Sequence, residues 1–434
     1  MMLASEAPRV SDAPPSLKMP PLSIVVPVPG PGPASRACLA ALETARTALG
    51  LDAEIIAAGV ADASSPSPRV TWVRPSGPGF GRALRAGLDA AHGEYIATVD
   101  AECAGASAVL EALWTNRDTA EVVVASRYVS GADARMGLLR HVLSRALNKT
   151  FSRGLSLPVE DLSSAFRLYR ADVLRTYRIR ATDYDVLPEL LVRALAGGWR
   201  VREIPLHIEL SRRRRSVMPL VRLAAAYART FAGLWQLRNS INAADYDARA
   251  HDSIIPLQRY WQRQRHRHVT DLIAGQGPVL DVGCGSSRII AALPSGSVAV
   301  DVLANKLRYA RRFSRRLVRA SGFALPFADA SFPCVLCSQV IEHVPIESPI
   351  LSELRRVLAP GGRLVLGTPD YANWEWVWME KAYGFFKPGG YADEHIAHYT
   401  REGLVRQFEG LGYTHEATRY ILRGELILAF RKPA

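Results

Sequence analysis

The sequence contains little cysteine, lacks long apolar runs and has a deficit of negative charge. Only five of its 434 residues are cysteine, too few to suggest a disulfide framework, so a reducing compartment is expected. No uninterrupted apolar stretch approaches twenty residues, which argues against a transmembrane helix. Lys and Arg number 54 against 41 Asp and Glu, and the net charge of +13 favours anionic partners such as nucleotides and lipid phosphates.

The first twenty residues also lack the continuous apolar core of a secretory signal. The segment MMLASEAPRVSDAPPSLKMP is rich in Pro, Ser and Ala, and we expect residues 1–20 to form a disordered leader. A cytoplasmic protein is therefore expected, with contact to the inner surface of a membrane as an added option.

Cys334 and Cys337 form a single CxxC in the segment SFPCVLCSQVIEHV. Strand alternation points the two side chains to opposite faces, and the chain has no second pair that would complete a zinc site. We therefore predict that both thiols are core residues.

Two series of β-branched segments alternate with helical segments and predict two α/β domains with parallel sheets. The first series begins with LSIVVPV and includes EYIATVD and AEVVVASRY; the second includes VLDVGCG, SVAVDV and RLVLGTP. The composition changes near residue 240. We predict one domain at 21–215, a basic amphipathic helical linker at 216–241 and a second domain at 242–434.

The segment VLDVGCGSSRI predicts a strand, a glycine turn and a helix start. Gly283 and Gly285 allow backbone angles and a close ligand approach that a Cβ would block. The helix start offers N–H groups to a polar or anionic ligand. Asp301 ends the following strand, in VAVDV, where a carboxylate can accept hydrogen bonds from two ribose hydroxyls.

Together with ALPFADASFPCVLCSQVIEHV and ELRRVLAPGGRLVLGTP, these motifs resemble class I S-adenosylmethionine-dependent methyltransferases over about residues 242 to 430. The resemblance implies a Rossmann-like fold. It also implies that Asp281, Gly283 and Gly285 bind the methionine part of the cofactor and that Asp301 binds its ribose. Ser321 or a neighbour stands where the family often has an acid that contacts adenine.

Two segments are candidates for the acceptor side of this domain. Glu342 and His343 follow the fourth strand, and His343 is a candidate general base because an ordinary histidine titrates near neutrality. The alternative is a histidine that satisfies a loop hydrogen bond, since methyl transfer mainly needs alignment. His395 and His398 lie in DEHIAHYT, near an expected lid.

The segment YIATVDAEC predicts a buried strand that ends in an acidic pair, Asp100 and Glu102. Such a pair can hold a divalent metal ion against a diphosphate, or it can be two solvated acids in a turn. With the flanking segments, ASRY and LPVEDLSSAFRLYR, it resembles family-2 glycosyltransferases of the GT-A fold, and in particular polyprenyl- or dolichol-phosphate sugar synthases.

This second resemblance spans about residues 20 to 215 and implies several site residues. Asp100 and Glu102 correspond to the metal-binding Asp-x-Asp, with Mg²⁺ or Mn²⁺ as the ion, and Asp161 corresponds to a catalytic acid. Arg127 and Arg167 correspond to arginines that face the phosphates of the substrates, where a guanidinium can bind in bidentate fashion. The segments PVPGPG and AAGVADASS replace the family's acidic turns, so the position of the expected nucleobase-binding acid holds Gly59 or Val60, unless Asp62 substitutes.

Four consecutive arginines, Arg212 to Arg215, precede an apolar stretch broken by further arginines. This pattern suits amphipathic helices on an anionic membrane surface, near a lipid-phosphate acceptor. A solvated charge run, or a helix packed between the domains, would give the same pattern. No nucleic-acid recognition motif accompanies the charge, so no nucleic-acid partner is expected.

The sequence therefore predicts a bifunctional transferase. One half would transfer a methyl group from S-adenosylmethionine to a small-molecule, sugar or lipid-linked acceptor, and the other would transfer sugar from a nucleotide sugar to a lipid phosphate or related acceptor. The alternative is a methyltransferase whose degenerate glycosyltransferase-like domain is a binding or membrane-docking module.

Overall fold

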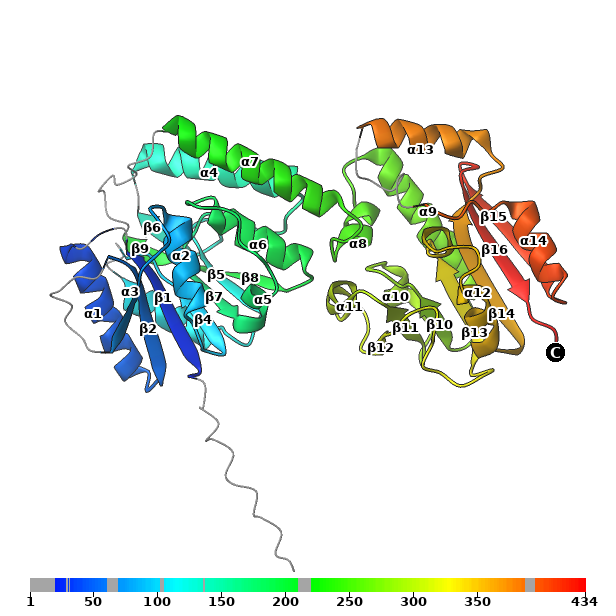
Figure 1. The fold of residues 1–434 in the computed structure, drawn as a ribbon, viewed down its shortest axis with the longest axis horizontal. Helices are drawn as coiled ribbons and strands as arrows, with labels where there is room; N and C mark the ends of the chain where they lie inside the picture. The colour runs from blue at the N-terminus through cyan, green and yellow to red at the C-terminus, as the bar shows by residue number, and fades with distance from the viewer. Residues whose placement is uncertain are drawn as a thin grey trace, which may run out of the picture.

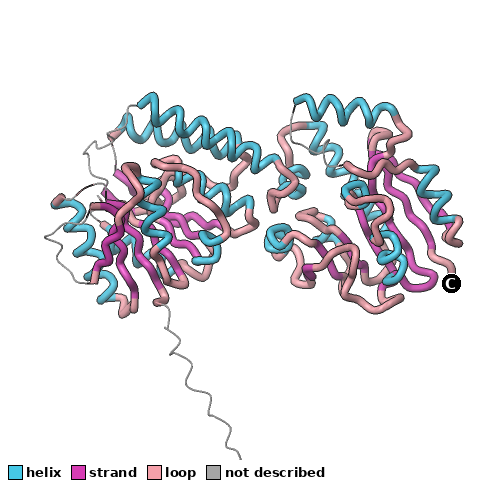
Figure 2. The backbone as a smooth tube through the Cα atoms, in the orientation of Figure 1, coloured by secondary structure: helices cyan, strands magenta, loops and turns pink. Residues whose placement is uncertain are grey.

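The computed structural model describes residues 20–28, 30, 32–60, 69–101, 105–135, 137–209, 220–386 and 395–434. These residues form two α/β units, each built on a seven-stranded sheet with helices packed on it (Figures 1 and 2). This confirms the predicted two-domain α/β class. Predictions for residues 1–19, Glu102, Arg212 to Arg215 and Asp393 lie outside the described residues.

The N-terminal sheet has the spatial order β3-β2-β1-β4-β7-β5-β8. Its strands are β1 (Leu22–Val28), β2 (Ala53–Gly59), β3 (Val70–Val73), β4 (Tyr95–Thr98), β5 (Val122–Ser126), β7 (Arg167–Arg170) and β8 (Val201–Pro205); a small second sheet pairs β6 (Asp133–Arg135) with β9 (His207–Glu209). All seven residues of β1 are buried, as a central strand with both faces covered requires.

Helices cover both faces of this sheet. They are α1 (Pro33–Ala48), α2 (Phe80–Asp89), α3 (Ala106–Thr115), α4 (Leu138–Gly154), α5 (Ala171–Arg175), α6 (Val186–Ala196) and α7 (Leu220–Asn239). Ile24 and Val26 of β1 pack with α1 and α3, whereas Val25 between them packs with α2 and α6. The alternation along β1 therefore separates two apolar cores.

The expectation of a purely parallel N-terminal sheet is wrong at β7. This strand pairs antiparallel with both β4 and β5, while β1 pairs parallel with β2 and β4. The chain enters β7 from the loop at Asp161, whose carboxylate binds Arg127 just past the end of β5. Because that loop lies at the carboxyl edge of the neighbouring strands, β7 has to run in the opposite direction.

The C-terminal sheet has the order β12-β11-β10-β13-β14-β16-β15. Its strands are β10 (Val279–Val282), β11 (Val298–Asp301), β12 (Leu317–Arg319), β13 (Phe332–Ser338), β14 (Leu358–Pro369), β15 (Thr414–Ile421) and β16 (Glu425–Arg431). The first five pair in parallel, and β16 pairs antiparallel with β14 and β15. The expectation of a parallel sheet therefore fails here at β15 and β16, which form a terminal hairpin.

The helices of this unit are α8 (Tyr246–His251), α9 (Pro256–Ile273), α10 (Ile289–Ala292), α11 (Ala304–Ala310), α12 (Ile350–Val357), α13 (Trp374–Phe386), α14 (Arg401–Glu409) and the 3₁₀ helix η1 (Ile341–His343). Cys334 and Cys337 of β13 are both buried and belong to different core clusters. The predicted packing of the two thiols on opposite faces is confirmed.

Helix α7 packs on the N-terminal unit, beside α4 (Figure 1). The ring of Phe151 lies 5.1 Å from that of Phe231 and 6.0 Å from that of Tyr227. The end of α7 leads to a buried ion pair, in which the guanidinium of Arg238 donates to both carboxylate oxygens of Asp245, at 2.7 and 2.8 Å. The predicted linker 216–241 therefore includes a helix that packs on protein along part of its surface.

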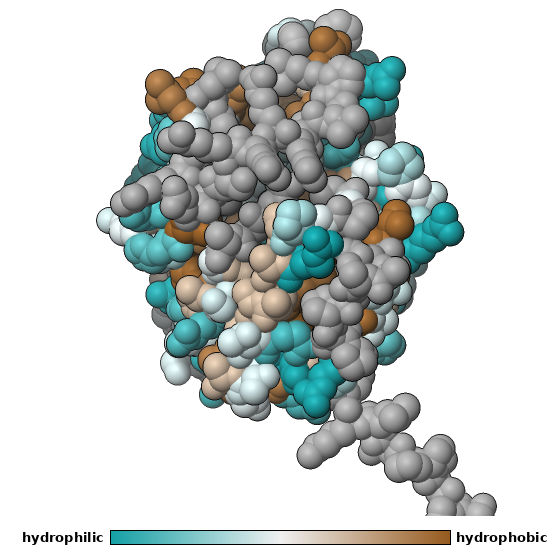
Figure 3. Space-filling model, turned by 90° about the vertical axis from the view of Figure 1, so that its left-hand side faces the viewer, coloured by the Kyte–Doolittle hydropathy of each residue, from teal (hydrophilic) through white to brown (hydrophobic). Residues whose placement is uncertain are grey.

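A contact between α11 and the loop after α6 joins the two units directly. Arg308 of α11 donates a hydrogen bond to the carbonyl of Gly197 and lies 3.7 Å above the ring of Trp199. On the face of the N-terminal unit in Figure 3, apolar residues are scattered among hydrophilic ones over the surface that is described. No helix among the described residues has the length and apolar character that crossing a membrane requires.

Candidate functional site

The glycine turn lies at the carboxyl edge of the C-terminal sheet, directly after β10. Gly283 and Gly285 have φ angles of 75° and 55°, in the region that favours glycine. A Cβ on Gly283 would lie 2.2 Å from Cγ2 of Val340, and a Cβ on Gly285 would lie 2.8 Å from Oδ2 of Asp247. Both positions therefore require glycine, because the angles and the space exclude a side chain.

Two acids stand beside this turn on neighbouring strands. Asp281 is in β10 and Asp301 ends β11, and both are almost fully buried. Asp301 accepts hydrogen bonds from the backbone N–H of Gly285 and of Leu303, each at 2.8 Å. A carboxylate has about four acceptor positions, so Asp301 retains capacity for ligand hydroxyls.

The electrostatics of the two acids are coupled. Burial and the nearby charge of Asp301 raise the pKa of Asp281 to about 7. Burial also raises the pKa of Asp301, although the hydrogen bonds from Leu303 and Gly285 act in the opposite direction. Two acids whose ionisation is suppressed by burial favour a cationic ligand that compensates the charge.

Asp247 of α8 is a site residue that the sequence analysis missed. Its Oδ2 accepts from the backbone N–H and the hydroxyl of Ser286, at 3.2 and 3.1 Å, and from Nζ of Lys306 at 3.0 Å. Burial would raise its pKa, but Lys306 and Ser286 lower it to about 2. The segment NAADYDARA carries no motif that indicates this contact across 39 residues of sequence.

The candidate acceptor-side residues gather at the same edge of the sheet, after β13. Atoms of Glu342, His343 and His395 that could ligate a metal ion all lie within 4.8 Å of one another. Burial raises the pKa of Glu342 to about 7. Nδ1 of His395 lies 2.6 Å from Oε1 of Glu380 and 2.9 Å from the hydroxyl of Tyr371.

The N-terminal unit brings Arg127 and Asp161 together. The carboxylate of Asp161 accepts from Nε and Nη2 of Arg127, at 2.7 and 2.6 Å, and from the backbone N–H of Arg127, Ser163 and Ser164. Burial alone would raise the pKa of Asp161, but the hydrogen bonds and charge of Arg127 lower it. The bidentate pairing indicates that Asp161 positions Arg127; its predicted catalytic role stays a prediction.

The other two predicted residues of this unit are Asp100 and Arg167. Asp100 is half-buried and follows β4 by two residues, at the carboxyl edge of the strand. Arg167 is fully buried and donates to the carbonyls of Leu187 and Leu162, at 2.6 and 2.5 Å. These contacts indicate that Arg167 holds the fold, and its predicted contact with substrate phosphate stays a prediction.

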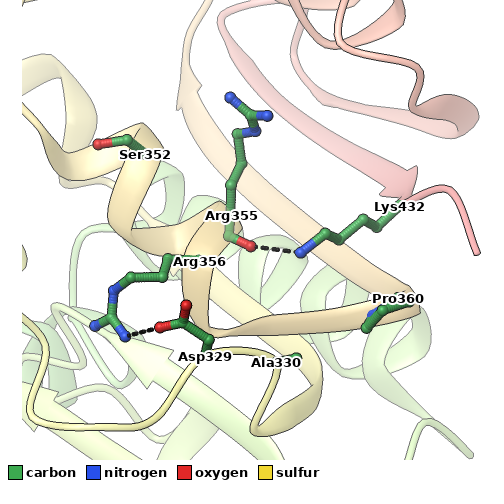
Figure 4. Close-up of a pocket in the computed structure, with 7 residues that line it drawn as sticks. All are labelled: Asp329, Ala330, Ser352, Arg355, Arg356, Pro360 and Lys432. Atoms are coloured by element: carbon green, nitrogen blue, oxygen red, sulfur yellow. Dashed lines mark hydrogen bonds and ion pairs between the residues drawn. The ribbon is translucent and has the colours of Figure 1, made fainter.

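A surface pocket lies at the opposite edge of the C-terminal sheet (Figure 4). Arg356 reaches Asp329 at 2.7 Å there, and Nζ of Lys432 donates to the carbonyl of Arg355 at 2.7 Å. The residues of the pocket lie before β13, before and at the start of β14, and after β16, whereas the glycine turn follows β10 and η1 follows β13. It is therefore separate from the candidate site.

Two family models match the chain. A model described as "Glycosyl transferase family 2" matches residues 54–178, and a model described as "Methyltransferase domain" matches residues 280–366. The first match contains Asp100, Arg127 and Asp161, and the second contains the glycine turn and η1.

Individual proteins match smaller parts. An uncharacterized methyltransferase of Mycobacterium sp. (strain KMS) is 33% identical over 171 residues, which are 38% of this chain and 62% of that protein. An S-adenosylmethionine-dependent methyltransferase from Mesorhizobium loti has a TM-score of 0.32 and 14% identity, covering 41% of this chain and 100% of its own. Glucosyl-3-phosphoglycerate synthase from Mycobacterium tuberculosis, in complex with Mn²⁺ and UDP-glucose, has a TM-score of 0.37 and 18% identity, covering 50% and 79%.

The chain spans less than two thirds of the length of the curated relatives that it matches, from 30% to 62%. The two family matches are separate, follow each other along the chain and each cover part of one of the two sheets. The N-terminal unit is therefore a GT-A-like domain that matches glycosyl transferase family 2, and the C-terminal unit is a Rossmann-like domain that matches the methyltransferase domain family.

Proposed function

We propose that the C-terminal domain binds S-adenosylmethionine and transfers its methyl group to a small-molecule, sugar or lipid-linked acceptor. The observation that carries this proposal is the turn of Gly283 and Gly285, which has no room for side chains and lies between Asp281 and Asp301. Asp301 would bind the ribose hydroxyls, and Asp281 would face the positive charge of the methionine part. When bound, the cofactor supplies an electrophilic methyl group on a sulfonium.

The chain's own residues would bind and orient this cofactor. Asp301 is held in place by the N–H groups of Gly285 and Leu303, so its carboxylate is preorganised for a diol. Asp247 and Lys306 form an ion pair at 3.0 Å beside the turn, which places one charge of each sign near the expected amino-acid end of the ligand. The predicted role of His343 as a general base remains a proposal.

Calorimetric titration of the full chain with S-adenosylmethionine tests this function. Asp301→Ala should weaken binding at least tenfold, because it removes the diol acceptor and the support of the turn. Asp271→Ala is the matched control, since Asp271 lies on α9 in the same domain with its side chain 66% exposed. Equal binding by wild type and Asp301→Ala, or no binding by wild type, would contradict the proposal.

A second candidate function is glycosyl transfer from a nucleotide sugar to a lipid phosphate or related acceptor. It is favoured by Asp100 at the carboxyl edge of β4 and by the guanidinium that Asp161 holds in place. Asp100 with Glu102 would bind Mg²⁺ or Mn²⁺, which would neutralise the diphosphate. Contact with an anionic membrane through the basic tract belongs to the same proposal.

Titration with UDP- and GDP-sugars, with and without Mn²⁺, separates this function from a binding module. Metal-dependent binding that Asp100→Ala abolishes supports an active glycosyltransferase half. Metal-independent binding that Asp100→Ala leaves unchanged, or no binding by any donor, supports the alternative of a degenerate domain that docks another molecule or a membrane.

A further inference from the structure

Three side chains that can ligate a metal ion converge beside the glycine turn. Glu342 and His343 come from η1, and His395 comes from the segment that precedes α14. Their ligating atoms lie within 4.8 Å of one another, and the rings of His343 and His395 are 5.0 Å apart. One ion can therefore contact all three side chains after small adjustments.

Glu342 gives an independent reason to expect a ligand at this position. Its side chain is completely buried, and neither carboxylate oxygen has a hydrogen-bond partner among the described residues. A buried carboxylate without a partner is unfavourable, so buried charges are normally paired or bound to metal. A cation between Glu342 and the two histidines would supply the missing partner.

A carboxylate fixes the tautomer of His395. A carboxylate can only accept, so the Nδ1–H of His395 donates to Oε1 of Glu380 at 2.6 Å. The opposite ring nitrogen, Nε2, then carries the lone pair that a metal ion requires. A carboxylate behind a ligating histidine fixes its tautomer and orientation in many metal sites.

The backbone holds the two halves of the cluster in register. The main-chain carbonyl of Glu342 accepts from the N–H of Ile396 at 2.9 Å and of Ala397 at 3.1 Å. These bonds attach the residues next to His395 directly to η1. The three side chains are therefore brought together by fixed backbone contacts, which preorganises them for one ion.

We propose that Glu342, His343 and His395 form a binding site for a divalent transition-metal ion, with Glu380 as the residue that positions His395. Two imidazoles and one carboxylate suit Zn²⁺, Mn²⁺, Fe²⁺ or Co²⁺, whereas Mg²⁺ and Ca²⁺ prefer oxygen ligands. Three protein ligands leave at least one coordination position for another molecule.

The place of this site gives the ion a role that rests on the proposed methyl transfer. Val340, two residues before Glu342, packs against Gly283 of the cofactor turn. An ion at the cluster would lie beside the glycine turn, where its open position could bind a hydroxyl oxygen of the acceptor and orient it. A histidine that binds the ion cannot also serve as a general base, so this role replaces the one expected for His343.

The test uses the full chain, freed of metal with EDTA and of any affinity tag. Titration with Co²⁺ is followed by its visible absorption bands and by calorimetry, and Zn²⁺ is then added as a competitor. Glu342→Gln keeps the shape of the side chain but removes its charge, His395→Ala removes a ligand, and Glu380→Gln changes only the support of His395. His266→Ala is the matched control, because the rings of His266 and His251 form another histidine pair, 5.6 Å apart.

The expected result is one Co²⁺ per chain, displaced by Zn²⁺. Binding should be at least about tenfold weaker in Glu342→Gln and His395→Ala, roughly ten- to a hundredfold weaker in Glu380→Gln, and unchanged in His266→Ala. Circular dichroism checks that each variant is folded. If Glu342→Gln or His395→Ala is not folded, cobalt binding by Glu380→Gln decides, because Glu380 would not contact the ion itself.

Absence of the cobalt bands in the wild type, bands that persist in all three cluster variants, or bands lost in His266→Ala would overturn the metal site. S-Adenosylmethionine is titrated into the same metal-free sample. Cofactor binding without cobalt binding refutes only the metal site, whereas cobalt binding without cofactor binding refutes the proposed function and leaves the metal site standing.

Discussion

Replacing Asp281 by asparagine should remove a specific pH dependence from the C-terminal domain. Burial and the charge of Asp301 raise the pKa of Asp281 from 3.8 to about 7 in the folded protein. The folded state therefore holds this proton more tightly than the unfolded state does. An acid with a raised folded pKa makes stability fall as pH rises from the unfolded towards the folded pKa. The amide in Asp281→Asn would carry no charge at any pH in this range.

The shift sets the expected magnitude. Each pKa unit corresponds to about 1.4 kcal/mol, so a shift from 3.8 to about 7 corresponds to at most about 4 kcal/mol well above pH 7. Between pH 5 and pH 8, the two titration curves predict that this carboxyl lowers the free energy of unfolding by about 2.5 kcal/mol. For a domain of this size, that equals a fall in Tm of about 5 to 10 °C.

Thermal unfolding of wild type and Asp281→Asn at pH 5 to 8 measures this effect. The transition to follow is the one whose Tm rises when S-adenosylmethionine is added. Cofactor affinity gives a second readout. If the ionised carboxylate binds the cationic ligand, affinity should fall about tenfold per pH unit below the pKa and level off above it. Asp281→Asn should bind the cofactor more weakly than the wild type at pH 8, and its affinity should not show this dependence on pH.

Only the difference between the two proteins tests the argument, because other groups that titrate near neutrality are present in both. Asp271→Asn controls for the loss of a surface charge and should keep the wild-type profile. If the unfolding free energies of wild type and Asp281→Asn run parallel from pH 5 to pH 8, the carboxyl does not titrate as proposed, and the electrostatic account of the cofactor turn is refuted.

Three further substitutions test single contacts. Asp245→Asn leaves the buried Arg238 without its carboxylate and should lower the unfolding free energy in urea by about 3 to 5 kcal/mol. Arg127→Met leaves the buried Asp161 without its cationic partner and should lower the free energy of unfolding of the N-terminal domain by about as much. An unchanged unfolding transition of that domain would contradict this expectation. Gly285→Ala requires a strained φ angle of 55°; it should weaken cofactor binding in calorimetry by tenfold or more, and wild-type affinity would show that the turn does not approach the ligand.

Much of the fold follows from local patterns in the sequence. The buried run LSIVVPV and the motif VLDVGCG predict β1, β10 and the turn because β-branched residues and glycines act over a few neighbouring positions. The antiparallel direction of β7 does not follow from such patterns. It depends on where the Asp161 loop is held by Arg127, a contact between residues 34 positions apart.

The candidate site divides in the same way. Asp281, Gly283, Gly285 and Asp301 lie in or just after two strands that local patterns predict, and the structure places them at one edge of the sheet. Asp247 reaches the turn from a short helix upstream, through a contact that no spacing rule predicts. The approach of His395 to η1 likewise depends on a backbone pairing between segments more than fifty residues apart.

The contacts within the N-terminal domain determine which substitutions can test glycosyl transfer without also unfolding the domain. Gly59 is one of the two positions, with Val60, where a nucleobase-binding acid is expected. A Cβ at Gly59 would lie 2.3 Å from the carbonyl oxygen of Val28, so that position has no space for an acid. Arg127 and Asp161 stabilise each other in the interior, and removing either one costs stability whether or not sugar is transferred. Loss of stability in a variant of this pair therefore does not distinguish an active domain from an inactive one. Asp100 is only half-buried at the strand edge, so its replacement should disturb the core less than loss of the Arg127–Asp161 pair. Loss of donor binding in Asp100→Ala, with unchanged unfolding, would thus be informative about activity, whereas the same loss in a variant of Asp161 would not.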